Sequence, residues 1–76
     1  MEIQDFIEKF AEQFDDTDVL EFTPKTVFKE LDEWNSLIAL SVIAMVDEEY
    51  AVTLKGDDIR NSATVEDLYT IVKGRL

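Results

Sequence analysis

The chain has 76 residues, of which 46% are hydrophobic, and its 18 acidic and 7 basic side chains give a formal charge of -11. Because it contains neither histidine nor cysteine, the sequence excludes imidazole bases, Ser-His and Cys-His nucleophile pairs, Cys/His zinc sites and iron-sulfur clusters. The negative charge opposes binding to nucleic acid and to anionic membrane surfaces, and it favours basic protein partners.

Residues 2–14 carry apolar side chains at helical spacing. This pattern predicts an α-helix with one buried face. The apolar positions are Ile3, Phe6, Ile7, Phe10, Ala11 and Phe14. Charged and amide side chains fill the positions between them, so we expect the opposite face to meet water.

Residues 15–35 have no sustained period, which predicts a long connection. We predict one short helical turn after Thr23, with Pro24 at its first helical position. Apolar side chains are scattered through the segment, at Leu20, Phe22, Val27, Phe28, Leu31 and Trp34. The aromatic ones indicate that the connection packs over the core.

The sequence predicts a second helix from Ser36 to Tyr50, because Asn35 or Ser36 can accept a hydrogen bond from a free N–H of a first helical turn. The inward stripe is expected at Ala39, Val42, Ile43, Val46 and Tyr50. Only Ser41 is polar between residues 37 and 46. The helix therefore either lies among several neighbours or presents an apolar strip to something outside the monomer.

Residues 51–56 are expected to be a connector, followed by a short helix over residues 57–61. Thr64 and Asp67 have the spacing of a capping box, which predicts the start of the last helix. Its buried face is expected at Val65, Leu68, Ile71, Val72 and Leu76. Lys73 and Arg75 suit the negative end of that helix dipole.

These elements predict an all-α fold, a small antiparallel four-helix bundle with three longer helices, a short third helix and a long first loop. We expect a single domain over residues 1–76. The first ten residues lack a basic segment followed by an apolar one, and the apolar run of residues 37–46 is too short to span a bilayer. The simplest expectation is a cytoplasmic protein.

Ser36 is the candidate for chemistry. No imidazole is present to activate it, and no Ser-x-x-Lys pair follows it, so it is not predicted to be a nucleophilic catalyst. Two roles remain open. Ser36 either caps the helix, or carries a covalently attached phosphate that the free N–H groups and the helix dipole stabilise.

Acidic side chains close the second predicted helix, at Asp47, Glu48 and Glu49. They form either a solvated face or a docking rim for a basic partner. The segment of residues 16–25 contains acids but lacks the glycine and the terminal glutamate of an EF-hand. We therefore predict no metal site.

The segment LDEWNSLIALSVIAMVDEEYAVTL, residues 31–54, resembles the central segment of acyl carrier proteins, in which Asp-Ser-Leu opens the second helix. Here the motif reads Asn35-Ser36-Leu37. The resemblance covers nearly the whole chain: an amphipathic first helix, a long loop, a helix ending in acids and an aromatic, a short third helix, and a last helix opened by SATVEDL.

The resemblance implies a non-enzymatic carrier. A phosphopantetheinyl transferase would move 4'-phosphopantetheine from coenzyme A to the Ser36 hydroxyl, and the thiol of this arm would carry acyl groups as thioesters. By similarity, the acyl chain would be sheltered by Ala39, Val42, Ile43, Val46 and Tyr50. Partner enzymes with basic docking surfaces would contact Leu37, Leu40, Ser41, Ala44, Asp47 and Glu48. A monomer serving fatty acid, polyketide or other specialised biosynthesis is expected.

Two departures from the family pattern are visible. Asn35 replaces the usual Asp, and Ile38 and Ser41 stand where fatty-acid carriers often have acids. The docking face is therefore more apolar, which favours a dedicated set of partners, as in stand-alone bacterial carriers of specialised pathways. Two alternatives remain: a peptidyl or aminoacyl carrier, and an acidic helical interaction module that is never modified.

Overall fold

The structure is a computed structural model that describes residues 2–76. In that range the chain forms four α-helices and two 3₁₀ turns, and no strand. The elements are α1 (Ile3–Ala11), η1 (Val19–Glu21), η2 (Phe28–Glu30), α2 (Ser36–Tyr50), α3 (Gly56–Arg60) and α4 (Val65–Gly74). The prediction of an all-helical fold, with three longer helices, one short helix and a long first loop, is confirmed.

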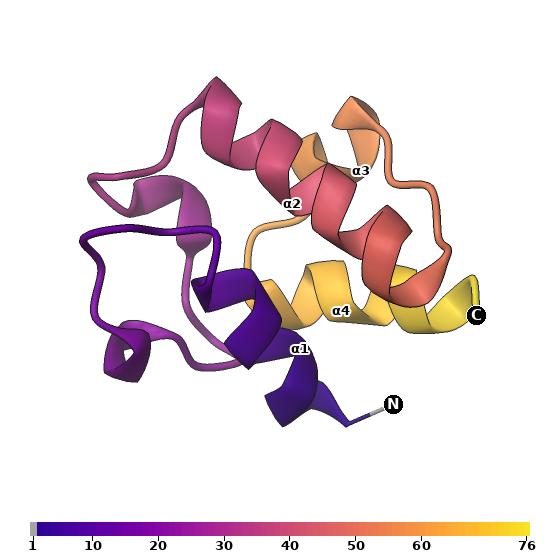
Figure 1. The fold of residues 1–76 in the computed structure, drawn as a ribbon, viewed down its shortest axis with the longest axis horizontal. Coiled ribbons are helices and arrows are strands. Elements are labelled where there is room, and N and C mark those ends of the chain that lie inside the picture. The colour runs from indigo at the N-terminus through magenta and orange to yellow at the C-terminus, as the bar shows by residue number, and fades with distance from the viewer. Residues whose placement is uncertain (1) are drawn as a thin grey trace.

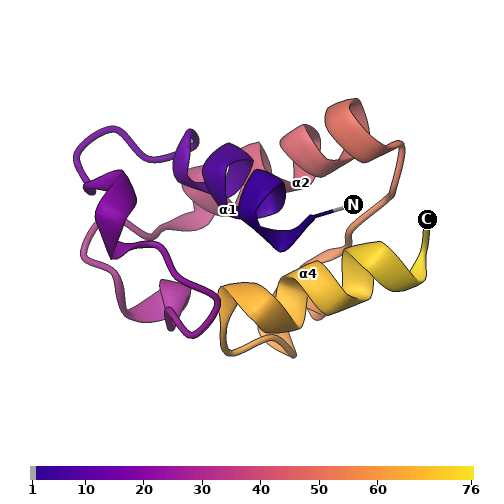
Figure 2. The same ribbon diagram turned by 90° about the horizontal axis from the view of Figure 1, so that it is seen from below.

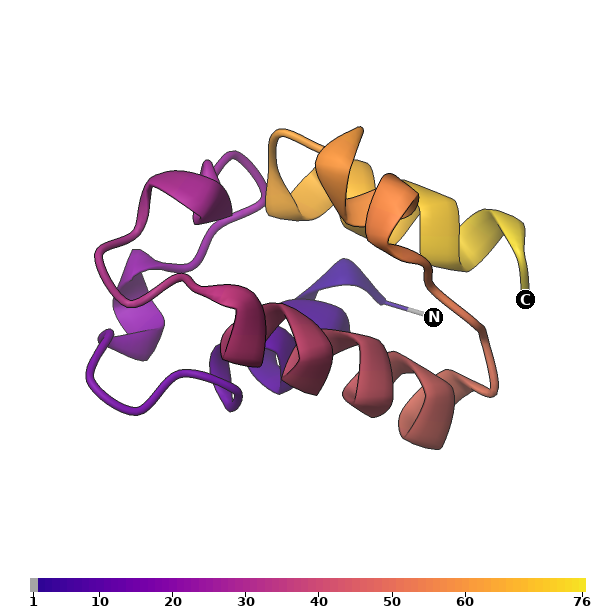
Figure 3. The ribbon, with the colours of Figure 1, turned by 90° about the horizontal axis from the view of Figure 1, so that it is seen from above.

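The helices surround one hydrophobic core. α1 contacts both α2 and α4, and α3 contacts α4. In Figures 1 and 2, α1 runs leftward from the N-terminal end, whereas α2 and α4 run rightward. The connection between α1 and α2 forms the left end of the molecule, opposite the C-terminus (Figures 1 and 3).

The helical spacing of α1 buries its phenylalanines. Phe6 and Phe10 are fully buried and Phe14 nearly so. The helix itself is shorter than the predicted range, because after Ala11 the backbone bonds tighten: the N–H of Phe14 donates to the carbonyl of Ala11 at 3.0 Å. This tighter turn still directs Phe14 inward, where its ring lies 4.9 Å from that of Phe22.

The long connection differs from the prediction at Pro24. No helical turn begins there; residues 23–26 form a single reverse turn, closed by the Thr26 N–H and the Thr23 carbonyl at 3.1 Å. The Thr26 hydroxyl connects this turn to the preceding η1. It accepts a hydrogen bond from the Thr23 N–H and donates one to the Glu21 carbonyl, both at 2.8 Å. The helical turns lie on either side, at η1 and η2.

The aromatic residues of the connection pack on the core as predicted. Phe22 and Phe28 are buried, and Trp34 is half-buried against Phe28. The aliphatic residues divide differently. Leu31 is half-buried and packs against the core, but Leu20 and Val27 are exposed. The apolar contacts between this connection and the core therefore come mainly from its aromatic rings.

The Glu33 carboxylate ties the two ends of the connection together. It accepts hydrogen bonds from the backbone N–H groups of Asp15, Asp16 and Thr17 and from the Thr17 hydroxyl, at 2.5 to 3.0 Å. Desolvation acts to raise the pKa of Glu33, but these four hydrogen bonds outweigh it and hold the pKa below its ordinary value of 4.5. The ionised form therefore stabilises the loop.

α2 begins and ends at the predicted residues. Asn35 is its N-cap and accepts from the Ile38 N–H at 3.0 Å. At the other end, Ala51 adopts a left-handed conformation with φ of 55°. That conformation is strained for a residue with a Cβ, and helices that end in it usually place glycine there.

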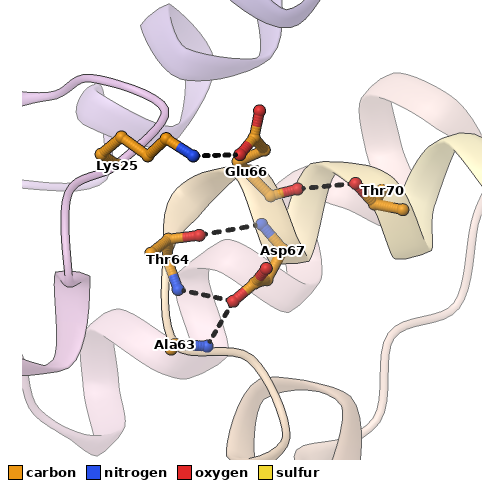
Figure 4. Close-up of polar contacts among 6 residues, drawn as sticks. All are labelled: Lys25, Ala63, Thr64, Glu66, Asp67 and Thr70. Atoms are coloured by element: carbon orange, nitrogen blue, oxygen red, sulfur yellow. Dashed lines mark hydrogen bonds and ion pairs between the residues drawn. The ribbon is translucent and has the colours of Figure 1, made fainter.

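The short helix is α3, Gly56–Arg60, one residue earlier at each end than predicted. The capping box of α4 is confirmed (Figure 4): the Asp67 N–H donates to the Thr64 hydroxyl at 3.2 Å, and Asp67 accepts from the Thr64 and Ala63 N–H groups at 3.0 Å. These backbone bonds lower the pKa of Asp67. The N–H groups of Val65 and Glu66 reach back to carbonyls of Thr26 and Pro24.

The C-terminal end of the chain corrects the expectation that Leu76 is buried. Val65, Leu68 and Val72 are buried and Ile71 is half-buried, but Leu76 is 63% exposed because α4 ends at Gly74. Arg75 lies beyond the helix and forms two hydrogen bonds of 2.8 Å with Asp58. The bonds from Arg75 are the main cause of the lowered pKa of Asp58.

Replacing Ala51 by glycine should stabilise the protein. The left-handed conformation costs glycine no Cβ clash, so Ala51→Gly should raise the free energy of unfolding by about 0.5 to 1 kcal/mol. The same substitution at exposed Ala44, inside α2, should lower it by about 1 kcal/mol. Urea denaturation of both variants measures the two effects. A loss of stability in Ala51→Gly would contradict the strain argument.

Glu33 should make stability depend on pH. The pKa of Glu33 is lower in the folded chain than in the unfolded chain. Its contribution to the free energy of unfolding is therefore complete at pH values above the ordinary pKa of a glutamate, and is lost as the pH falls through the pKa of the folded state. Glu33→Gln should therefore unfold at a lower temperature than wild type at pH 7, with a difference that shrinks towards pH 3. Thermal unfolding across this range tests it. Glu30→Gln is the control, since the exposed Glu30 carboxylate makes no hydrogen bond within residues 2–76.

Candidate functional site

Ser36 occupies the first helical position of α2 and is exposed. Asn35 performs the capping, because its side chain accepts from the Ile38 N–H and its carbonyl accepts from the Ala39 N–H, both at 3.0 Å. The Ser36 hydroxyl makes no hydrogen bond with residues 2–76. Of the two roles left open by the sequence, capping therefore belongs to Asn35.

The helix N-terminus beside Ser36 offers unpaired donors. In the described chain, nothing accepts a hydrogen bond from the N–H groups of Ser36 and Leu37. The first turn of α2 contains no acid. Free N–H groups and the positive end of the helix dipole attract anions, so the surroundings of the Ser36 hydroxyl suit a phosphate.

An open pocket of about 410 Å³ adjoins Ser36. Three separate segments form it: η2, the start of α2, and α3. Its lining consists of Lys29, Trp34, Asn35, Ser36, Ala39, Gly56, Ile59 and Arg60. The volume falls within the roughly 300 to 1,000 Å³ typical of small-molecule sites.

The two bases of this lining are held differently. The Lys29 ammonium donates to the carbonyls of Ile59 and Arg60 at 3.2 and 3.0 Å, which joins η2 to the end of α3. The Arg60 guanidinium forms an ion pair with Asp57 at 2.6 Å, in which both side chains are more than 70% exposed. Lys29 is therefore anchored, whereas Arg60 lies at the surface.

The predicted inward stripe of α2 is only partly a pocket lining. Val42 and Val46 are fully buried in the core, while Ala39, Ile43 and Tyr50 are half-buried. Of these five, Ala39 alone contributes to the pocket beside Ser36. Whether the others shelter an acyl chain stays a prediction.

Tyr50 has an unusual environment at the far end of the stripe. Its buried hydroxyl has no hydrogen-bond partner among residues 2–76, and its ring packs against Phe6 with centroids 6.1 Å apart. Desolvation, followed by the charges of Asp5 and Glu49 and by Tyr69, raises the pKa of Tyr50. The phenol therefore remains neutral at physiological pH.

The predicted docking residues lie on one side of α2. Leu37 is 73% and Leu40 62% exposed. Ala44, Asp47 and Glu48 are also exposed, and Ser41 is half-buried. Their spacing of three and four residues makes a continuous strip along the helix. Met45 lies outside this strip and is buried in the core.

Sequence reasoning missed Lys29, Gly56, Ile59 and Arg60 as parts of the site. Their only signal was indirect, since bases are rare in this chain and two of the seven come together here. No group of three or more His, Cys, Asp or Glu residues suited to a metal ion occurs in residues 2–76. In the same range, no helix combines the length and apolar character needed to cross a membrane.

Comparison of the chain with protein-family models, with curated proteins and with solved structures found no match.

Proposed function

We propose that the chain is a carrier protein of the acyl carrier type, with an acyl-carrier-like helical bundle and a 4'-phosphopantetheine arm attached at Ser36. The observation that carries the proposal is the exposed Ser36 hydroxyl, which is left without a structural task because Asn35 caps α2. The resemblance of Asn35-Ser36-Leu37 to the family motif supports the same residue.

The electrostatics of Ser36 suit a covalently attached phosphate. Two unpaired N–H groups and the positive end of α2 stabilise negative charge. The cap is the neutral Asn35, so no carboxylate of the capping residue repels the phosphate. Lys29 and Arg60 in the adjoining lining add positive charge.

The residues present fit the arm. Ser36 Oγ would form the new phosphoester bond as the diphosphate bond of coenzyme A breaks; 3',5'-ADP would leave, and the hydroxyl proton would pass to a base of the transferase. The exposure of Ser36 gives a transferase access. The arm would supply a thiol that carries acyl groups as thioesters, which the chain, having no cysteine, does not provide itself. The chain acts as a substrate of other enzymes rather than as a catalyst.

The surface of α2 supports a docking role. Leu37 and Leu40 offer apolar contact area near Ser36, and Asp47 and Glu48 offer charge at the other end of the strip. Acids in the last turn oppose the helix dipole, and α2 has no base there to offset them. Their presence is better explained by partners with basic surfaces than by helix stability.

Exposed Leu37 and Leu40 also favour a second candidate, an acidic interaction module that binds partners without modification. A peptidyl or aminoacyl carrier is a third candidate that shares the arm with the first. Modification at Ser36 separates both carriers from the interaction module. Loading of the modified chain by acyl-activating or aminoacyl-adenylating enzymes then separates the carriers from each other.

We expect Ser36 to be the attachment site. Co-expression with a broad-specificity phosphopantetheinyl transferase, followed by intact-mass measurement, should show one added 4'-phosphopantetheine on the wild type. Ser36→Ala should remain unmodified, whereas Thr53→Ala, which removes an exposed hydroxyl outside α2, should be modified as wild type. If several transferases all left the wild type unmodified, the carrier proposal would be wrong.

The acids at the end of α2 should speed encounter with the transferase. Reversing Asp47 and Glu48 to Lys should slow association by roughly 10-fold at low salt, because opposite charges steer diffusion. The effect should shrink at physiological ionic strength, where the screening length is about 8 Å. Stopped-flow kinetics measure it. The control reverses Glu8 and Glu12 on α1, and equal slowing in both double variants would argue against docking at α2.

A further inference from the structure

The pocket beside Ser36 differs in charge from two other pockets of the molecule. Its lining has two bases and no acid. A pocket on the long connection is lined by Asp16, Thr17, Glu21, Leu31, Asp32 and Glu33, and one between α1 and α2 by Asp5, Glu8, Lys9, Glu12 and Glu49. In a chain of charge -11, positive charge is thus gathered next to the one residue proposed to receive a phosphate.

Lys29 is held in place with its charge uncompensated. Its ammonium has three donors, and two of them bond to the carbonyls of Ile59 and Arg60. No carboxylate in residues 2–76 forms an ion pair with it. The side chain is therefore already ordered. An anion that binds here is attracted by the ammonium charge, and the entropic cost of fixing a flexible lysine is avoided.

Arg60 supplies a second cation, whose guanidinium is not fixed in place by burial. Its ion pair with Asp57 is exposed on both sides, and such pairs contribute little to stability. A guanidinium with five donors can keep Asp57 and still bond a phosphate.

We propose that Lys29 and Arg60 bind the phosphate of the arm on Ser36 and hold the start of the arm in this pocket. The inference rests on the proposed function for the identity of the ligand. Charge-assisted bonds from Lys and Arg are the strong bonds to phosphate. They offset the repulsion that an added anion meets in a strongly acidic chain.

The remaining residues of the lining provide an apolar surface for the arm and a fluorescent residue that can report binding. Trp34, Ala39 and Ile59 give the pocket an apolar wall, against which the carbon chain of the arm can pack. Trp34 is the only tryptophan of the chain. Its fluorescence therefore reports occupancy of the pocket without any label.

A titration of the unmodified chain tests the pocket without any transferase. Adding 4'-phosphopantetheine at low salt should change Trp34 emission, whereas pantetheine, which lacks the phosphate, should bind at least 10-fold more weakly, roughly the worth of one charged hydrogen bond. Lys29→Gln and Arg60→Gln should each weaken binding by roughly 10-fold. Lys25→Gln should not, because Lys25 belongs to the same loop but pairs with Glu66 outside the lining.

Equal binding of the two compounds, no binding of either, or equal affinity in all variants would overturn the inference. Thermal unfolding checks that Lys29→Gln remains folded, and the exposed Arg60→Gln gives an independent answer if it does not. The two proposals fail separately. Modification at Ser36 without these charge effects would retain the carrier and remove the phosphate pocket. Charge-dependent binding of 4'-phosphopantetheine without modification of Ser36 would retain the phosphate pocket and remove the carrier proposal.

Discussion

The packing of Phe28 against Phe10 is the contact on which the candidate site depends. Both rings are fully buried, with centroids 5.5 Å apart, and the contact draws the end of the long connection onto α1. Lys29 follows directly, and reaches the end of α3 because Phe28 points inward. Trp34 packs edge-on to Phe28 at 4.9 Å, which fixes the chain just before Ser36. One buried ring therefore positions both sides of the pocket.

The fold neutralises part of the negative charge and leaves part of it available. Asp58 is paired with Arg75, and Asp67 and Glu33 accept several backbone N–H groups. These acids serve the structure. Asp47 and Glu48 form no ion pair within residues 2–76 and are exposed. Asp47 and Glu48 are therefore available to a partner at the C-terminal end of α2, whereas Lys29 and Arg60 line the pocket at the end that carries Ser36.

The helices could be predicted from the sequence because their signals are local. An Asn cap, a capping box and an apolar period act within a few residues, and they located α2 and the start of α4 correctly. The connection could not be predicted in detail, because its course is set by distant contacts, such as Glu33 with residues 15–17 and the Val65 N–H with Thr26. The pocket was missed for the same reason, since its bases come from segments that meet only in the folded chain. Ser36 could be named as a candidate from the sequence because its neighbours in sequence are also its neighbours in the helix cap.

α2 breaks local rules that the other helices keep. Asp5 and Lys9 suit the dipole of α1, and acids begin and Lys73 ends α4. α2 has the reverse arrangement, with no acid in its first turn and three in its last. It also exposes Leu37 and Leu40, which gain nothing from the core. Helix stability explains neither the reversed charges nor the exposed leucines. Both features lie on the helix that begins at Ser36. We therefore infer that this surface is shaped by binding rather than by folding.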